Sequence, residues 1–286
     1  MSDSDHPPAI PGDRLVFVGG LHRSGTTPLS RALAAHPEVS GLTGTGVPED
    51  EGQHLQDVYP RLRTLGGMGT FARNPRAHLT DSSELVSPEN AARLLASLTP
   101  YWDLDRRLLL EKSPANLVMG RFLQALFPGS ALVVVVRNPV VSALALEKWN
   151  PLLVARNGRR RTTLVGRVEN WARAHETLRD DLPHLRRVHV LRYEDLVSRP
   201  DEELACIAAL LGLSTPVDGS SISSGRSDTY AERWAAMATG SPWRRRIRRR
   251  IVASYADDML AFGYDPETLA ADPLWRPPMT QTHPDA

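Results

Sequence analysis

The segment GGLHRSGTT, residues 19–27, has the narrowest structural requirements of any part of the sequence. It follows a short apolar run, RLVFVGG at residues 14–20, and leads into residues 26–35, which favour a helix. A buried strand, a glycine-rich turn and a helix in this order form a loop whose backbone N–H groups can cradle an anion. Gly20, Gly25 and Thr27 fit the spacing of a phosphate loop, but Thr26 stands in the lysine position and the nearest cation is Arg23. The segment predicts an anion-binding loop that takes further positive charge from elsewhere in the fold.

Three further apolar segments are predicted to be strands, at residues 106–114, 131–139 and 187–196. Predicted helices alternate with them, at residues 87–102, 116–127, 139–149 and 201–213. The run ALVVVV at 131–136 has no polar residue, which is typical of a strand buried on both faces. This alternation predicts a three-layer, P-loop-like α/β domain with a central parallel sheet flanked by helices. The stretches 40–82, 151–166 and 214–229 are predicted to be loops, the first with short helices.

Length and composition fit one globular domain. We expect a flexible N-terminal tail at 1–13, the domain at 14–270 and a C-terminal tail at 271–286. A net charge of +1 gives no support to nucleic-acid binding. The N-terminus lacks the pattern of a signal peptide and the longest apolar run has six residues, so we expect a cytoplasmic protein without a transmembrane segment. The single cysteine, Cys206, falls among apolar helix positions and is expected to be a packed core thiol, and no pattern specifies an oligomeric state.

Ligands of parallel α/β sheets bind beyond the carboxyl ends of the strands, where this sequence places several cations. Lys112 ends the second predicted strand, Arg137 follows the third, and Arg192 closes the fourth. A nucleotide kinase would need an aspartate for Mg²⁺ at the end of its apolar strand, where this chain has Arg137. A guanidinium at this position suits a second phosphate better than a metal ion. The pattern therefore predicts a ligand with two separate anionic groups and no required metal.

The ordered series of segments resembles the sulfotransferases that use 3′-phosphoadenosine 5′-phosphosulfate (PAPS), especially bacterial members and the tyrosylprotein branch. The segments are HRSGTTPLSRALAAHPEV (22–39), EKSPANL (111–117), VVVVRNPVVSALALEKW (133–149), VLRYEDLVSRP (190–200) and DDMLAFGYDP (257–266). The resemblance covers most of residues 14–266 and implies PAPS as sulfuryl donor and 3′-phosphoadenosine 5′-phosphate (PAP) as product.

The same resemblance implies a set of ligands for PAPS. The 5′-phosphosulfate would be bound by Arg23, Ser24, Gly25, Thr26 and Thr27, and the 3′-phosphate by Arg137. The family usually has a serine eight residues after that arginine; this chain has Ala145 there, and Ser142, one helical turn earlier, is the candidate substitute. Tyr193 matches a tyrosine near the nucleotide, and Arg226 is the candidate for closing over the 3′-phosphate or the adenine.

Catalysis needs cations near the leaving group and a base for the acceptor hydroxyl. Arg23 and Lys112 are predicted to neutralise charge on the bridging oxygen, the position that the family resemblance assigns to Lys112. The family places a glutamate or histidine base on the loop after the first helix, which corresponds to GVPEDEGQHLQ at 46–56. Glu51 is the first candidate, His54 the second and Glu49 the third.

Two alternatives to a PAPS-dependent sulfotransferase remain at this point: a P-loop kinase with an atypical loop, and a non-catalytic nucleotide-binding module. The acceptor is expected to be a hydroxyl or phenol of a small molecule, such as a secondary metabolite, or of a glycolipid. The arginine-rich segments 156–163 and 243–250 could contact an acidic substrate, a membrane surface or nucleic acid. In the second, Ile247 and Ile251 lie four residues apart, so a solvated helix with one packed face also explains it.

Overall fold

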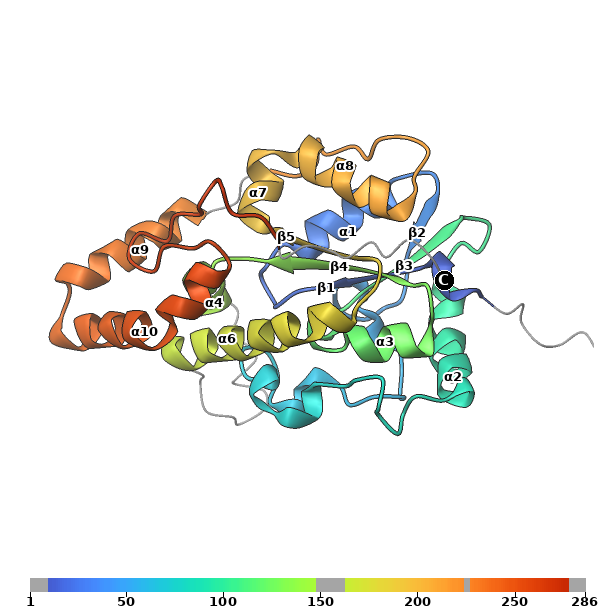
Figure 1. Ribbon diagram of the computed structural model, residues 1–286, viewed down its shortest axis with the longest axis horizontal. Coiled ribbons are helices and arrows are strands. Elements are labelled where there is room, and N and C mark those ends of the chain that lie inside the picture. The colour runs from blue at the N-terminus through green and yellow to red at the C-terminus, as the bar shows by residue number, and fades with distance from the viewer. Residues whose placement is uncertain (1–9, 148–162, 224–226, 278–286) are drawn as a thin grey trace, which may run out of the picture.

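A parallel sheet of five strands forms the centre of the protein in the computed structural model, which describes residues 10–147, 163–223 and 227–277 (Figure 1). The strand order is β2-β3-β1-β4-β5. The strands are β1 (Leu15–Gly19), β2 (Val39–Gly41), β3 (Leu108–Lys112), β4 (Ala131–Val136) and β5 (Val188–Arg192). The predicted three-layer α/β architecture is confirmed.

Helices cover both faces of this sheet (Figure 1). The helices are α1 (Thr26–Ala34), α2 (Pro88–Leu98), α3 (Gly120–Leu126), α4 (Pro139–Glu147), α6 (Leu164–Asp181), α7 (Tyr193–Ser198), α8 (Pro200–Leu211), α9 (Ser227–Thr239) and α10 (Pro242–Ala261). Helices α1, α7 and α8 lie on one face, and α3 and α6 lie on the other. Among the described residues, no helix is both long and apolar enough to cross a bilayer.

Strand β4 shows why the sheet is sandwiched between two cores. Its side chains alternate between the faces, so Leu132, Val134 and Val136 pack in one hydrophobic core. Val133 and Val135 pack in the other. All residues of β4 are buried, as the run without polar residues predicted. Hydrophobic burial on both faces therefore fixes the strand's position and leaves its carboxyl end as the place where polar residues emerge.

The loop predictions need two corrections. Strand β2 (Val39–Gly41) pairs with β3 at the start of a region predicted to be loops, and a run of three residues is too short to show a strand periodicity. Helix α6 begins at Leu164 and helix α9 at Ser227, each inside a segment predicted to be loop. The short helices predicted for 40–82 are present as single 3₁₀ turns. Residues 151–162 lie outside the described residues.

Cys206 is exposed, so the prediction of a packed core thiol is wrong. The buried positions of α8 are Leu204, Ile207, Ala208 and Leu211. This spacing of three and four residues defines one face of the helix, and Cys206 lies off it. The apolar composition of the segment suggested that Cys206 is buried. The orientation of the helix about its axis, however, determines which residues are buried.

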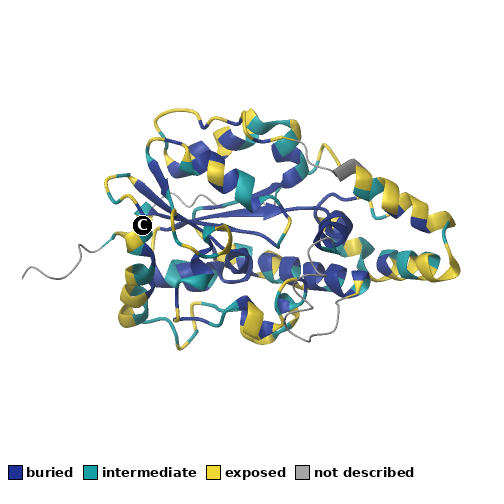
Figure 2. Cartoon of the chain, turned by 180° about the vertical axis from the view of Figure 1, so that it is seen from behind, coloured by how far each residue is buried: buried dark blue, intermediate teal, exposed yellow. Residues whose placement is uncertain are grey.

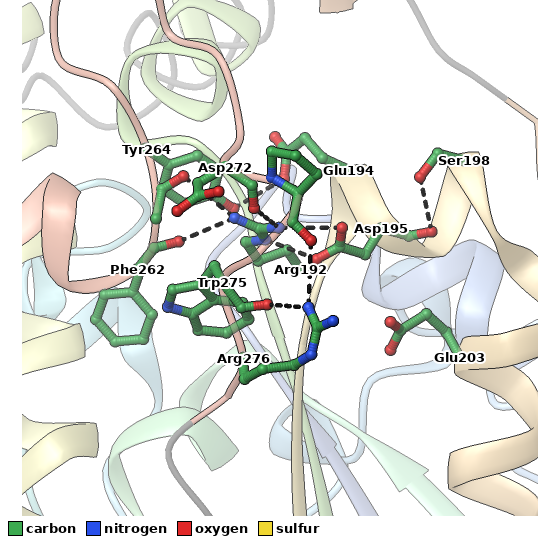
Figure 3. A network of polar contacts seen from close by, with 12 residues as sticks. Arg192, Glu194, Asp195, Ser198, Glu203, Phe262, Tyr264, Asp272, Trp275 and Arg276 are labelled. Atoms are coloured by element: carbon green, nitrogen blue, oxygen red, sulfur yellow. Dashed lines mark hydrogen bonds and ion pairs between the residues drawn. The ribbon is translucent and has the colours of Figure 1, made fainter.

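A buried arginine ties the C-terminal segment to the end of β5 (Figure 3). The side chain of Arg192 is fully buried and donates to both carboxylate oxygens of Asp195, at 2.6 and 3.0 Å. It also donates to the carbonyls of Gly263 (3.1 Å) and Asp272 (2.8 Å), and it lies 4.6 Å from the ring centre of Trp275. The charge of Arg192 is therefore used inside the fold and not presented to a ligand.

We expect replacement of Arg192 by methionine to lower the free energy of unfolding by about 3–5 kcal/mol, because Asp195 and the two carbonyls would remain buried without their donor. Urea unfolding of wild type and variant measures this difference. The matched control is Arg173→Met, since Arg173 forms an exposed pair with Glu176 that contributes less than about 1 kcal/mol. Equal destabilisation by the two substitutions would contradict the role given to Arg192.

Candidate active site

The loop between β1 and α1 has the backbone geometry of an anion cradle. Gly25 is the N-cap of α1 with φ 102°, and Arg23 has φ 71°, so the chain turns sharply before the helix. The first N–H groups of α1 have no acceptor within the helix and point toward its N-terminal end, where the helix dipole favours negative charge. The hydroxyl of Ser24 is buried and has no hydrogen-bond partner among the described residues. Thr26 and Thr27 open the helix at the same place.

Arg137 and Tyr193 lie directly against this loop. Arg137 is buried at the end of β4, and its Nη1 donates to the carbonyl of Arg23 at 2.7 Å. Its guanidinium lies 4.2 Å from the ring centre of Tyr193. The Tyr193 ring also packs on Gly25, where an added Cβ would lie 2.3 Å from Cδ2 of the ring. The structure therefore brings together the residues predicted to bind the 5′-phosphosulfate and the 3′-phosphate. The close approach of the Tyr193 ring to the backbone requires glycine at position 25.

Lys112 and Glu51 form a buried ion pair at the end of β3. Lys112 Nζ lies 3.1 Å from Oε1 of Glu51, and both residues are less than a tenth exposed. Oε2 of Glu51 accepts a hydrogen bond of 2.5 Å from the side chain of Gln53 and lies 3.6 Å from Nε2 of His54. The first two candidate bases and the candidate lysine thus lie in one cluster.

The charges of this cluster shift the pKa values of its members. Burial alone would raise the pKa of Glu51, but His54 and the Lys112 ammonium outweigh it and hold that pKa at about 2. His22 lies in the loop between β1 and α1, called the anion loop below. Burial lowers the pKa of His22 to about 4, although the charge of Glu51 opposes the shift. At neutral pH Glu51 is therefore an anion and His22 is neutral.

A second buried carboxyl, Glu111, holds the Glu51 loop in place. Its Oε1 accepts from the backbone N–H of Gly52 at 3.0 Å and from the hydroxyl of Ser113 at 2.5 Å, while its Oε2 accepts from Asn116 at 2.6 Å. The backbone N–H of Gln53 donates to Ser113 Oγ at 2.9 Å. Burial raises the pKa of Glu111, although these hydrogen bonds oppose the shift. The sequence pattern did not indicate this role, although the motif EKSPANL contains all three side chains.

Glu49, the third candidate base, lies apart from the cluster. It is half exposed, and its Oε2 lies 3.8 Å from Nη2 of Arg31. With Asp50 and Lys112 it lines an open cleft of about 370 Å³ between α1 and the loop that follows β2. The cleft also contains Thr27 and therefore begins beside the anion loop.

Ser142 occupies a different cavity. It lies on α4 with a buried hydroxyl that has no hydrogen-bond partner among the described residues. The cavity measures only about 20 Å³ and is lined in part by His22, Gly69, Arg167 and Trp171. The assignment of Ser142 to the 3′-phosphate stays a prediction, as do the other ligand assignments. Arg226 lies outside the described residues.

Comparison with known proteins identifies the family. The chain matches the model of the Sulfotransferase family over residues 16–217, which is more than half of its length, and it belongs to that family. It is 24% identical to protein-tyrosine sulfotransferase 2 of Gallus gallus over 213 residues, 70% of this chain and 51% of that protein. It is 26% identical to the nodulation protein NoeE of Sinorhizobium fredii over 219 residues, 69% of this chain and 50% of that protein. The chain therefore spans about half the length of these curated relatives.

Among solved structures, a sulfotransferase from Mycobacterium avium, STF9, matches with a TM-score of 0.49 and 16% sequence identity. The match covers 87% of this chain and 77% of that one.

The low pKa of Glu51 predicts an acid-dependent loss of stability. A carboxyl whose pKa is lower in the folded than in the unfolded state stabilises the fold above its unfolded pKa, near 4.5, and the stabilisation is lost as the pH falls toward 2. The difference corresponds to on the order of 3 kcal/mol. Urea unfolding at a series of pH values should show a shallower pH dependence for Glu51→Gln than for wild type. Parallel curves for wild type and Glu51→Gln would contradict the low pKa of Glu51.

Proposed function

We propose that this protein transfers the sulfuryl group of PAPS to a hydroxyl or phenol of a small-molecule or glycolipid acceptor and releases PAP. The observation that carries the proposal is the buried Lys112–Glu51 pair, which lies at the sheet edge that also holds the anion loop and Arg137. When bound, PAPS would supply the sulfuryl group: its S–O bond to the phosphate breaks as a new S–O bond to the acceptor forms, and the acceptor proton passes to a base.

The residues present fit an anion with two separate acidic ends. The N-terminus of α1, with Arg23 and the Ser24, Thr26 and Thr27 hydroxyls, would hold the 5′-phosphosulfate. Arg137 is already oriented by the Arg23 carbonyl and the Tyr193 ring, and it would hold the 3′-phosphate. The buried Ser24 hydroxyl, which lacks a partner among the described residues, supports a ligand at the first position. The expectation that no metal is required remains part of this proposal.

Glu51 is our candidate for the general base, and its ion pair with Lys112 regulates its basicity. With Lys112 beside it, Glu51 has a pKa of about 2 and is a weak base. An anion that binds near Lys112 competes with Glu51 for the ammonium group. Since the charge of Lys112 contributes to the low pKa, weakening the pair raises the affinity of Glu51 for the acceptor proton. Lys112, thus released, can stabilise negative charge on the leaving oxygen.

The lining of the cleft beside Lys112 supports a polar, hydroxylated acceptor. Thr27 and Thr43, which carry hydroxyl groups, line it together with the acidic residues Glu49 and Asp50. Hydroxyls and carboxylates can exchange hydrogen bonds with a sugar or a polyol. Two cations, Arg31 and Lys112, line the same cleft, so its charges balance and favour no strongly charged acceptor. This chemistry favours a neutral small molecule or a glycolipid headgroup.

Binding of PAP provides the first test. We expect wild type to bind PAP in calorimetric titrations with EDTA present, and Arg137→Ala to bind it about 30–100-fold more weakly, because a charge-assisted contact is lost. Arg173→Ala, a change at an exposed pair outside the site, is the control with unchanged affinity. Unaltered PAP affinity in Arg137→Ala would refute the 3′-phosphate assignment. Binding of ATP only with Mg²⁺, and none of PAP, would favour the kinase alternative.

Turnover provides the second test. With labelled PAPS and a panel of phenols, sugars and glycolipids, we expect Lys112→Ala and Glu51→Gln to lower kcat by about 10²–10⁴-fold, the range for loss of acid–base or electrostatic catalysis. His54→Ala should have a smaller effect, since His54 reaches the reaction through Glu51. Glu176→Gln, a change at an exposed pair outside the site, is the control and should keep kcat nearly unchanged. Tight PAP binding without turnover of any acceptor would favour the non-catalytic alternative.

A further inference from the structure

A helical hairpin, α9 and α10, extends beyond the carboxyl ends of β4 and β5, the edge of the sheet that holds the candidate site (Figure 1). Helix α9 packs against α4, and α10 packs against α6 and α9. The arginine-rich segment WRRRIRRR, residues 243–250, forms the first two turns of α10. The proposed function uses no residue of this segment.

Packing fixes the rotational orientation of α10. Ile251 and Met259 are buried, and Ile247 and Tyr255 pack against the same core. These positions are spaced by four residues, so they define the inner face of the helix. The opposite face is exposed along its length (Figure 2). It carries Trp243, Arg246, Arg249, Arg250, Ala253, Asp257 and Leu260.

Most of the arginine charge in this segment is not used by the fold. Arg245 donates to the carbonyl of Gly240, and Arg248 pairs with Glu267. The other four arginines are exposed and have no carboxylate partner within the described residues; they are Arg244, Arg246, Arg249 and Arg250. Against them, the outer face has a single acidic residue, Asp257. A local surface of strong positive charge thus exists on a chain whose net charge is only +1.

The same face carries two of the large apolar side chains that are most exposed. Trp243 is 68% exposed and Leu260 is 55% exposed. They lie at opposite ends of the outer face, about 26 Å apart at 1.5 Å per residue. Exposed arginines attract anionic lipid headgroups, and an exposed tryptophan on the same helix face can lie at the level of those headgroups.

We propose that the outer face of α10 binds the surface of an anionic lipid bilayer. The arginines would contact lipid phosphates, and Trp243 and Leu260 would enter the boundary between headgroups and acyl chains. A nucleic acid also offers phosphates, but it has no apolar phase for Leu260. The binding itself does not depend on sulfuryl transfer.

This placement also bears on the acceptor, in a step that rests on the proposed function. The hairpin extends beyond the carboxyl ends of β4 and β5 (Figure 1), and Lys112 at the end of β3 and the anion loop after β1 lie at the same end of this parallel sheet. A chain docked through α10 therefore carries its site close to the bilayer. An acceptor with a lipid anchor is concentrated at that surface, which suits the glycolipid class.

The experiment is co-sedimentation of the full chain with vesicles of phosphatidylcholine, with and without phosphatidylglycerol. We expect binding to the vesicles that contain phosphatidylglycerol, at least about 10-fold weaker binding to phosphatidylcholine alone, and loss of binding as salt is raised. Arg246→Glu with Arg250→Glu should abolish binding, and Trp243→Ala should weaken it several-fold. The matched control is Arg76→Glu with Arg186→Glu, which makes the same charge change at exposed positions outside the hairpin.

All variants are exposed substitutions, and PAP affinity and thermal unfolding verify that each remains folded. Vesicle binding that persists in Arg246→Glu with Arg250→Glu, or that falls equally in the control pair, overturns the proposal. So does tighter binding to RNA or DNA than to phosphatidylglycerol vesicles, or no vesicle binding by wild type. Failure of PAP to bind wild type would refute the proposed function and leave the vesicle result standing.

Discussion

The buried ion pair between Lys112 and Glu51 joins the sheet to the loop that follows β2, and the candidate site is built around this contact. Lys112 belongs to β3, whose position is set by hydrophobic packing on both faces of the sheet. Glu51 belongs to a loop with little regular structure, so it needs its own anchor. Glu111 and Ser113 provide that anchor through the backbone of Gly52 and Gln53. Glu51 thus pairs with Lys112, while Glu111 holds the loop that carries Glu51.

Buried cations with hydrogen-bonding partners also lie at the ends of β4 and β5. A cation at the end of a sheet strand is buried by the helices around it, and a buried charge is costly unless it is paired and hydrogen-bonded. Arg192 is satisfied by Asp195 and by carbonyls of the C-terminal segment. Arg137 contacts the Arg23 carbonyl and the Tyr193 ring, and both contacts lead to the anion loop. The partners of each arginine therefore decide whether its charge serves the fold or a ligand.

Much of the fold could be read from local patterns. The apolar run of β4 and the glycines before α1 need no distant partner to be recognised, because strand burial and the turn geometry act over a few residues. The short strand β2 could not be found in this way, since it exists only through its pairing with β3. Cys206 shows the same limit within a helix: its neighbours are apolar, but packing against the sheet decides which side of α8 is buried.

The sequence by itself determined the α/β class, the anion loop and the cations at the strand ends, because each depends on residues close together in the chain. Only the tertiary structure decided which of these charges face a common site. Glu51 and Lys112 are 61 positions apart, and their contact depends on how the loop after β2 folds back on β3. In the sequence, Arg192 and Arg137 both lie at the end of a predicted strand. The C-terminal segment, however, buries Arg192 and accepts its hydrogen bonds. Long-range packing sets both outcomes, since the energy of a charge depends on the partners that surround it.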